Sequence, residues 1–196
     1  MSKTTKIVLG IVGIVVVLCL CLTSVGVVAG VWGISRTVTL NPQKVQAAAD
    51  EIMSYDMPPG YHNLFVMNLG IMKVLSITAI SKSPGMPTPP MIGITQVVMN
   101  AQLDPVRMRQ VLLDSVNRNM RKNNVTLKLV KQEIIDLRGA PTEVFTFEGI
   151  NDQGIQYRAV GTAYFPARNG VASVLISGET AAWDEQAMDN FIRSIR

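Results

Sequence analysis

The stretch TEVFTFEGINDQGIQYRAVGTAYFPARNGVASVLIS, residues 142–177, decides the fold. It consists of short runs of β-branched, aromatic and small residues, separated by segments rich in Gly, Asn and Asp, which is typical of strands joined by tight turns. A further run of this kind lies just before it. The predicted strands are 125–133, 142–148, 155–165 and 171–177, and the predicted turns are 139–141, 151–154 and 167–170. Strands that follow one another so closely predict an antiparallel sheet.

Helices are predicted on either side of this region. Asn41-Pro42 and Asp104-Pro105 each place an N-cap residue before a proline at the first helical position. The closing segment 181–196 carries one apolar stripe that includes Trp183 and Phe191. Between the first two helices, the sequence predicts a hairpin over 61–80, a proline-rich loop over 81–90 and a strand over 91–99.

This order of elements predicts an α+β fold in which helices pack on an antiparallel sheet. The sequence places a membrane-spanning helix before this domain, over residues 7–34. That stretch holds no charged residue and exceeds the roughly 20 apolar residues that a span needs. Trp32 lies near its far end, where an indole suits the membrane interface. The expected fold class is therefore a transmembrane helix followed by an α+β domain.

Two alternatives exist for residues 7–34. A cleaved signal peptide has an apolar region of about 7–15 residues, which is shorter than this one, although Val27 and Ala29 could precede a cleavage point. A lipoprotein signal needs a small residue before its cysteine, whereas Leu precedes both Cys19 and Cys21. An uncleaved anchor is the favoured interpretation.

Basic residues predict the orientation of this segment. Lys3, Lys6 and the amino terminus precede it, which favours a cytoplasmic tail at 1–6. Residues 35–55 then form a juxtamembrane segment and helix, and 56–196 form an extracytoplasmic domain. Because Lys3, Lys6 and Arg36 supply most of the net charge of +4, that domain is nearly neutral and nothing indicates binding to nucleic acid.

The candidate binding residues are few. Basic side chains cluster on or beside the helix expected after Asp104, and they suggest a patch for anionic lipid headgroups or an acidic partner, although they also fit an ordinary solvated helix face. The members of this patch are Arg107, Arg109, Arg118, Arg121 and Lys122. Gly26 and Gly30 have the spacing of a helix-dimerisation motif and suggest a possible homodimer. Asn124 begins a glycosylation triplet, which matters only in a eukaryotic secretory pathway.

No catalytic, cofactor or metal site is predicted. His62 is the single histidine and both cysteines lie within 7–34, so no second His and no Cys can join it in a zinc site, and a surface or capping role is the favoured interpretation over a catalytic one. Methionines around Met86 and Met91 could ligate Cu(I), but methionine more often fills apolar gaps. The sequence also has no phosphate-binding or nucleophile-elbow motif.

Four segments resemble the PsbP/DcrB/Mog1-like domains. They are YDMPPGY (55–61), DLRGAPTEVFTF (136–147), the strand at 154–165 and the closing MDNFIRSIR (188–196). The resemblance covers about 56–196 and implies a PsbP/Mog1-like sandwich. That family is functionally mixed and shares no catalytic residues, so the resemblance implies no activity.

These observations predict a non-catalytic protein rather than an enzyme. The leading hypothesis is a single-pass membrane protein whose extracytoplasmic domain binds or stabilises another envelope protein. The alternative is a binding module for an apolar small molecule or lipid. An apolar pocket of several hundred cubic ångströms with few polar groups would favour the alternative.

Overall fold

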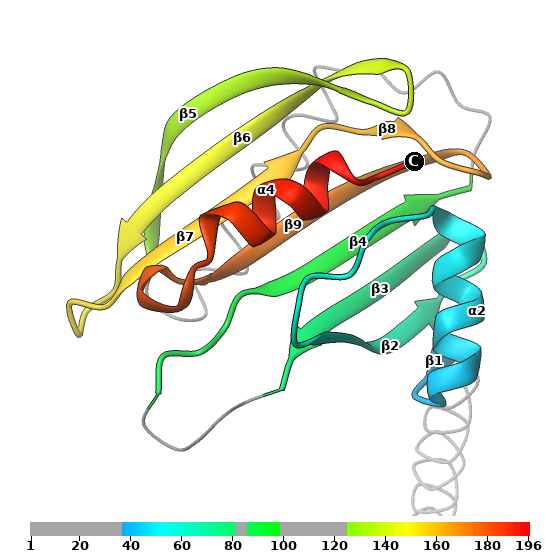
Figure 1. The fold of residues 1–196 in the computed structure, drawn as a ribbon, viewed down its shortest axis with the longest axis horizontal. Helices are drawn as coiled ribbons and strands as arrows, with labels where there is room; N and C mark the ends of the chain where they lie inside the picture. Colours follow the sequence, from blue (N-terminus) through cyan, green and yellow to red (C-terminus); the bar gives the residue numbers. More distant parts are fainter. Residues whose placement is uncertain (1–36, 81–85, 99–124) are drawn as a thin grey trace, which may run out of the picture. The chain divides into compact units, whose positions relative to one another are not determined.

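A computed structural model describes residues 37–80, 86–98 and 125–196 (Figure 1). The chain divides into two compact units, Met1–Val38 and Thr39–Arg196, and the second unit contains nearly all of the described residues. The predicted span at 7–34, with Trp32, Gly26 and Gly30, lies outside them. The helix expected after Asp104 lies outside them as well.

The second unit is built on one large sheet. Its nine strands follow the order β1-β2-β3-β4-β9-β7-β6-β5, with β8 paired to β9, and the pairs from β2 onward are antiparallel. The strands are β1 (Val38–Thr39), β2 (Tyr61–Asn68), β3 (Met72–Ala79), β4 (Met91–Val97), β5 (Thr126–Leu137), β6 (Ala140–Ile150), β7 (Gln156–Thr162), β8 (Phe165–Pro166) and β9 (Val171–Glu179). The described helices are α2 (Pro42–Ile52) and α4 (Glu185–Arg193), with a 3₁₀ turn η1 (Thr180–Ala182) before α4.

The predicted fold class is wrong. Instead of a membrane-crossing helix followed by a sheet with several flanking helices, the structure is mainly a nine-stranded sheet with two helices of 11 and 9 residues. Among the residues that the structure describes, no helix is long and apolar enough to cross a membrane. The sheet is larger than expected because β5 and β6 extend to 12 and 11 residues, well beyond the predicted runs.

A two-residue turn explains these longer strands. Leu137 pairs with Ala140, so only Arg138 and Gly139 connect β5 to β6. Both have a positive φ, at 59° and 76°, which is the pattern of a type I′ hairpin turn. The sequence prediction instead placed the turn at 139–141, because Gly and Pro are common turn residues, whereas Arg rarely adopts a left-handed conformation.

Helix α2 begins as predicted. The side chain of Asn41 accepts hydrogen bonds from the backbone N–H groups of Gln43 and Lys44, at 3.1 and 3.3 Å, and Pro42 is the first helical residue. Helix α4 is shorter than the predicted 181–196. Asp184 caps it by accepting a 3.0 Å hydrogen bond from the N–H of Ala187, so the helix begins only at Glu185.

Both helices pack on the same face of the sheet. The main core joins apolar residues of α2 and α4 to the residues of β3, β4 and β9 that share a face by register, such as Ile77, Ile92 and Ile176. Phe191, in α4, contacts Tyr55 edge to face with ring centroids 5.4 Å apart. In Figure 1, α4 runs across the sheet in front of β9. This face therefore holds the larger part of the core.

The opposite face carries a second, smaller core. Phe145, Phe147 and Ala159 are buried there together with Val125. They alternate along β6 and β7 with residues such as Thr146 and Val160, which point to the helix side. Both faces of β7 therefore carry buried residues.

Candidate functional site

A groove lies between α4 and strands β5, β6 and β7. Its volume is about 530 Å³. Val144, Thr146 and Val160 line it from the sheet, Met188 and Ile192 from the helix, and Val130 and Ile135 from β5. The groove exists because β5 and β6 continue beyond the part of the sheet that α4 covers. Side chains of the helix therefore cover only part of the apolar surface on this face.

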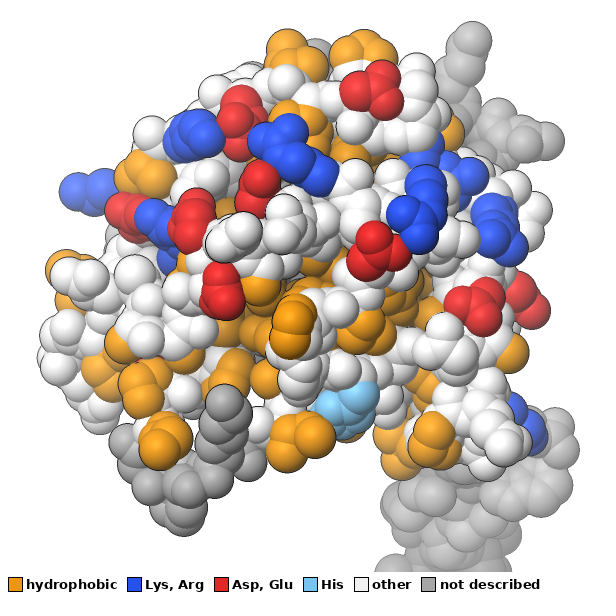
Figure 2. All heavy atoms as spheres, in the orientation of Figure 1, with side chains coloured by type: hydrophobic (Ala, Val, Ile, Leu, Met, Phe, Trp, Pro, Cys, Tyr) orange, Lys and Arg blue, Asp and Glu red, His pale blue; other side chains and the backbone are white. Residues whose placement is uncertain are grey.

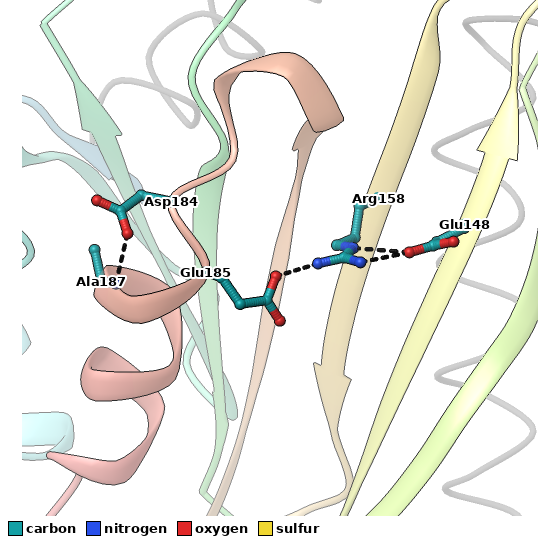
Figure 3. A network of polar contacts seen from close by, with 5 residues as sticks. All are labelled: Glu148, Arg158, Asp184, Glu185 and Ala187. Atoms are coloured by element: carbon teal, nitrogen blue, oxygen red, sulfur yellow. Dashed lines mark hydrogen bonds and ion pairs between the residues drawn. The ribbon is translucent and has the colours of Figure 1, made fainter.

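An ion-pair network links the two sides at one end of the groove (Figure 3). Arg158, on β7, donates to Glu148 of β6 through Nε at 3.0 Å and through a terminal nitrogen at 2.5 Å. The other terminal nitrogen pairs with Glu185 in the first turn of α4. The guanidinium also lies 5.8 Å from the centroid of the Trp183 ring. Arg158 thus connects the sheet to the start of α4, and its guanidinium lies over the ring of Trp183.

The rims of the groove are charged but balanced. On β5, Lys131 pairs with Glu133 at 3.0 Å, and on α4, Arg193 pairs with Asp189 at 2.8 Å. The hydrogen bond to Asp189 and its negative charge raise the pKa of Arg193, and the charge of Glu133 adds to this effect. Glu133 and Arg193 therefore interact electrostatically across the groove, although they belong to opposite rims.

This arrangement has the features of a binding groove. An apolar floor between paired charged rims can accept alternating apolar and polar groups along an extended ligand. In the part of the chain that the structure describes, no group of three or more His, Cys, Asp or Glu side chains could hold a metal ion. His62 is exposed on β2, away from the groove.

The predicted basic patch is not tested by the structure. Arg107, Arg109, Arg118, Arg121 and Lys122, as well as Asn124, lie outside the described residues. Sequence reasoning did not identify the groove. Its one visible signal was Arg158, a charged residue in the middle of a predicted strand, and its carboxylate partners come from segments that only the fold brings together.

Comparisons with known proteins give structural similarity but no family. No family model matches the chain, and no curated protein matches it. The chain is similar to LpqN of Mycobacterium tuberculosis, whose crystal structure is described as involved in cell envelope biogenesis, with 10% identity and a TM-score of 0.39 over 73% of this chain and 81% of that one. A similarity of this size identifies neither family nor function. Membership of the PsbP/DcrB/Mog1-like family remains a prediction.

Proposed function

We propose that the domain Thr39–Arg196 is a non-catalytic binding module of the cell envelope, which holds a segment of another protein in the groove beside α4. The groove itself carries this proposal. It is partly open to solvent, its floor carries Val144 and Val160, and paired charges line it, which fits a polypeptide segment with alternating side chains. A lipid chain or apolar small molecule would be better matched by an enclosed and less polar cavity.

The second part of the proposal concerns location. Residues 7–34 contain no charged side chain, and we propose that this segment attaches the chain to a membrane, with the domain outside the cytoplasm. Attachment raises the local concentration of the module near other membrane proteins, so modest affinity in the groove is sufficient for function.

Site-specific photo-crosslinking in intact cells tests the groove. A photoreactive amino acid is placed at Gln186, which is exposed on α4 and lines the groove, and in a matched control at Asn169, which is exposed in the β8–β9 turn. We expect a discrete protein adduct from position 186 and none from position 169. The variant Thr146→Trp, which fills the groove floor, should abolish the adduct, whereas Asn169→Trp should leave it unchanged.

Three other outcomes would contradict the proposal. An adduct that persists in Thr146→Trp would place the partner outside the groove. Adducts to lipid alone, removed by Thr146→Trp, would favour the alternative of a lipid-binding module. Turnover of a bound substrate by the purified full chain, lost in Thr146→Trp, would replace binding with catalysis.

A further inference from the structure

Charge is distributed unequally between the two halves of the sheet. No Asp or Glu occurs between Asp56 and Asp104, and Lys73 and Lys82 are the only Lys or Arg residues in that interval. Strands β2, β3 and β4 fall entirely within it. Figure 2 shows the consequence: acidic and basic side chains gather over the upper part of the view, and hydrophobic side chains gather along its lower side.

Large apolar side chains are exposed at one end of this half. Ile80, which follows β3, is 68% exposed, Met86 is 60% exposed, and Met91, at the start of β4, is 50% exposed. The backbone N–H of Ile80 bonds the carbonyl of Gly60 at 3.3 Å, which places the start of β2 at the same end. Exposed apolar residues that gather in this way indicate an interaction surface.

The chain enters the domain at this same end. In α2, Gln46 accepts a hydrogen bond from Asn63 near the start of β2, and Glu51 in the last turn pairs with Lys73 near the start of β3. The helix therefore runs from the Ile80 end of the sheet toward the Lys73 end. Leu40, just before the helix, is 67% exposed on the Ile80 side. Figure 1 draws the N-terminal end of α2 and the start of β4 on the lower side of the domain.

We propose that this end of the domain, marked by Leu40, Ile80, Met86 and Met91, rests on the lipid surface of the membrane. The proposal depends on the membrane attachment of residues 7–34 proposed above. Leu40 follows Ile34 by six residues, which span at most about 20 Å when extended, so the domain is held close to the bilayer. Apolar tips then insert among the headgroups.

The short connection to residue 34 favours lipid over a protein partner at this end. Strands β2, β3 and β4 contribute no Asp or Glu to it, so they present no carboxylate that anionic headgroups would repel. Leu69, Ile71 and Val98 are also exposed, at the opposite end of the same strands. That end carries the charged Glu51 and Lys73 and lies away from the chain entry, so we expect it to face the aqueous phase.

Fluorescence quenching in vesicles tests this orientation. The full chain with Cys19→Ser and Cys21→Ser is given one cysteine, as Met86→Cys or Met91→Cys, and is labelled with a polarity-sensitive fluorophore. It is reconstituted into vesicles of phosphatidylcholine and phosphatidylglycerol that contain a lipid spin-labelled near its headgroup. The control is Asn169→Cys, at the opposite end of the sheet. We expect blue-shifted emission and several-fold stronger quenching at positions 86 and 91 than at 169.

The outcomes separate this inference from the proposal on which it rests. If the chain sediments with the vesicles but labels at 86 and 91 are quenched no more than the label at 169, membrane attachment holds and the lipid-facing end is wrong. If the chain does not sediment with the vesicles, both fail. A stronger signal at 169 would reverse the orientation and overturn the inference.

Discussion

Phe191 connects parts of the chain that are distant in sequence. It is buried in the main core, it belongs to α4, and its ring meets the edge of Tyr55, which follows α2. Tyr55 in turn donates a 2.9 Å hydrogen bond to Asn63 on β2. Burial raises the pKa of Tyr55 to about 12, so this donor stays protonated at every physiological pH. One aromatic pair thereby joins two helices and the sheet.

Truncation of this residue should be costly. We expect Phe191→Ala to lower the free energy of unfolding by about 3–5 kcal/mol, because the lost contacts leave a cavity that the sheet cannot fill. The neighbouring Asn190 is exposed, and Asn190→Ala should change the free energy of unfolding by less than about 0.5 kcal/mol. Thermal or denaturant unfolding of both variants provides the comparison. Equal and small effects would mean that α4 is not docked on its own sheet.

At the residue scale, the sequence predicted which side chains are buried better than it predicted which side chains contact one another. The apolar stripe of 181–196 correctly identified Phe191 and Ile195 as core residues. Trp183 was expected on the same helical stripe, yet it lies before the helix, where it packs partly buried against the main core and also contacts Arg158. Periodicity reports which side chains avoid water, but a cation–aromatic contact between separate elements has no period in the sequence.

Among the elements, β9 depends on a side chain to complete its pairing. Strand β7 pairs with β9 as far as Gly161, and β8 resumes opposite Ala172. In the gap, the backbone N–H of Val174 donates to the buried hydroxyl of Thr162 at 2.9 Å. A hydroxyl therefore replaces a carbonyl of the missing strand segment.

Replacing that hydroxyl tests its importance. Thr162→Val keeps the side-chain shape but leaves a buried N–H without its acceptor, so we expect a loss of about 1–3 kcal/mol in the free energy of unfolding. Thr88→Val, at an exposed position, is the matched control and should have little effect. A Thr162→Val chain as stable as the original would show that the N–H finds another acceptor.

The ion pair between Glu51 of α2 and Lys73 of β3 makes the contact between these two elements depend on pH. Lys73 lowers the pKa of Glu51 from its usual 4.5 through a hydrogen bond and its charge. A lowered carboxyl pKa stabilises the fold above about pH 4.5, and this contribution is lost as the pH falls through the lowered value. Glu51 is largely exposed, so the effect is small.

Lys73→Met should reveal this contribution. We expect the variant to unfold at a lower denaturant concentration than the original chain at pH 7, and the difference to shrink near pH 3, where Glu51 becomes protonated. Lys44→Met, an exposed change on α2, should give a small difference that does not depend on pH in this range. A Lys73→Met effect of the same size at both pH values would assign it to packing alone.

The elements themselves were largely predictable. The Asn-Pro signal located the start of α2, and the apolar and alternating runs located β2 to β7 and β9 within a few residues. Strand β8 was not predicted, because 155–165 was expected to form one strand. The ends of β5, β6 and α4 were less predictable, because a left-handed Arg138 and a capping Asp184 decide them. Other turn and helix-start positions nearby are almost as favourable locally, and contacts with the rest of the fold decide which one forms.

For the whole domain, one pairing is decisive. Met91 of β4 lies opposite Ser177 of β9, so residues far apart in the sequence unite the two halves of the sheet. Sequence patterns identify strands but carry no record of which distant strands pair, because register depends on the complete set of neighbours. For the same reason the groove, formed by β5 to β7 and α4, was not predicted.

Removal of β9 should therefore affect the whole domain. A chain ending at Gly170 lacks the strand that pairs with β4, β7 and β8. We expect it to lose cooperative unfolding and to become sensitive to protease throughout, whereas Phe191→Ala should remain folded at low temperature. Persistent resistance of residues 39–98 in the truncated chain would show that β2 to β4 fold without their distant partner.

Arg196, which follows α4, pairs with the segment that follows α2. The backbone N–H of Arg196 donates to the carbonyl of Ser54, and the N–H of Ser54 donates back to the carbonyl of Arg196, each at 3.0 Å. An amide just beyond the end of a helix normally exchanges its hydrogen with solvent rapidly. Here the amide of Arg196 should exchange only when α4 lifts from the sheet, so deuterium uptake at that single position measures how often the helix opens.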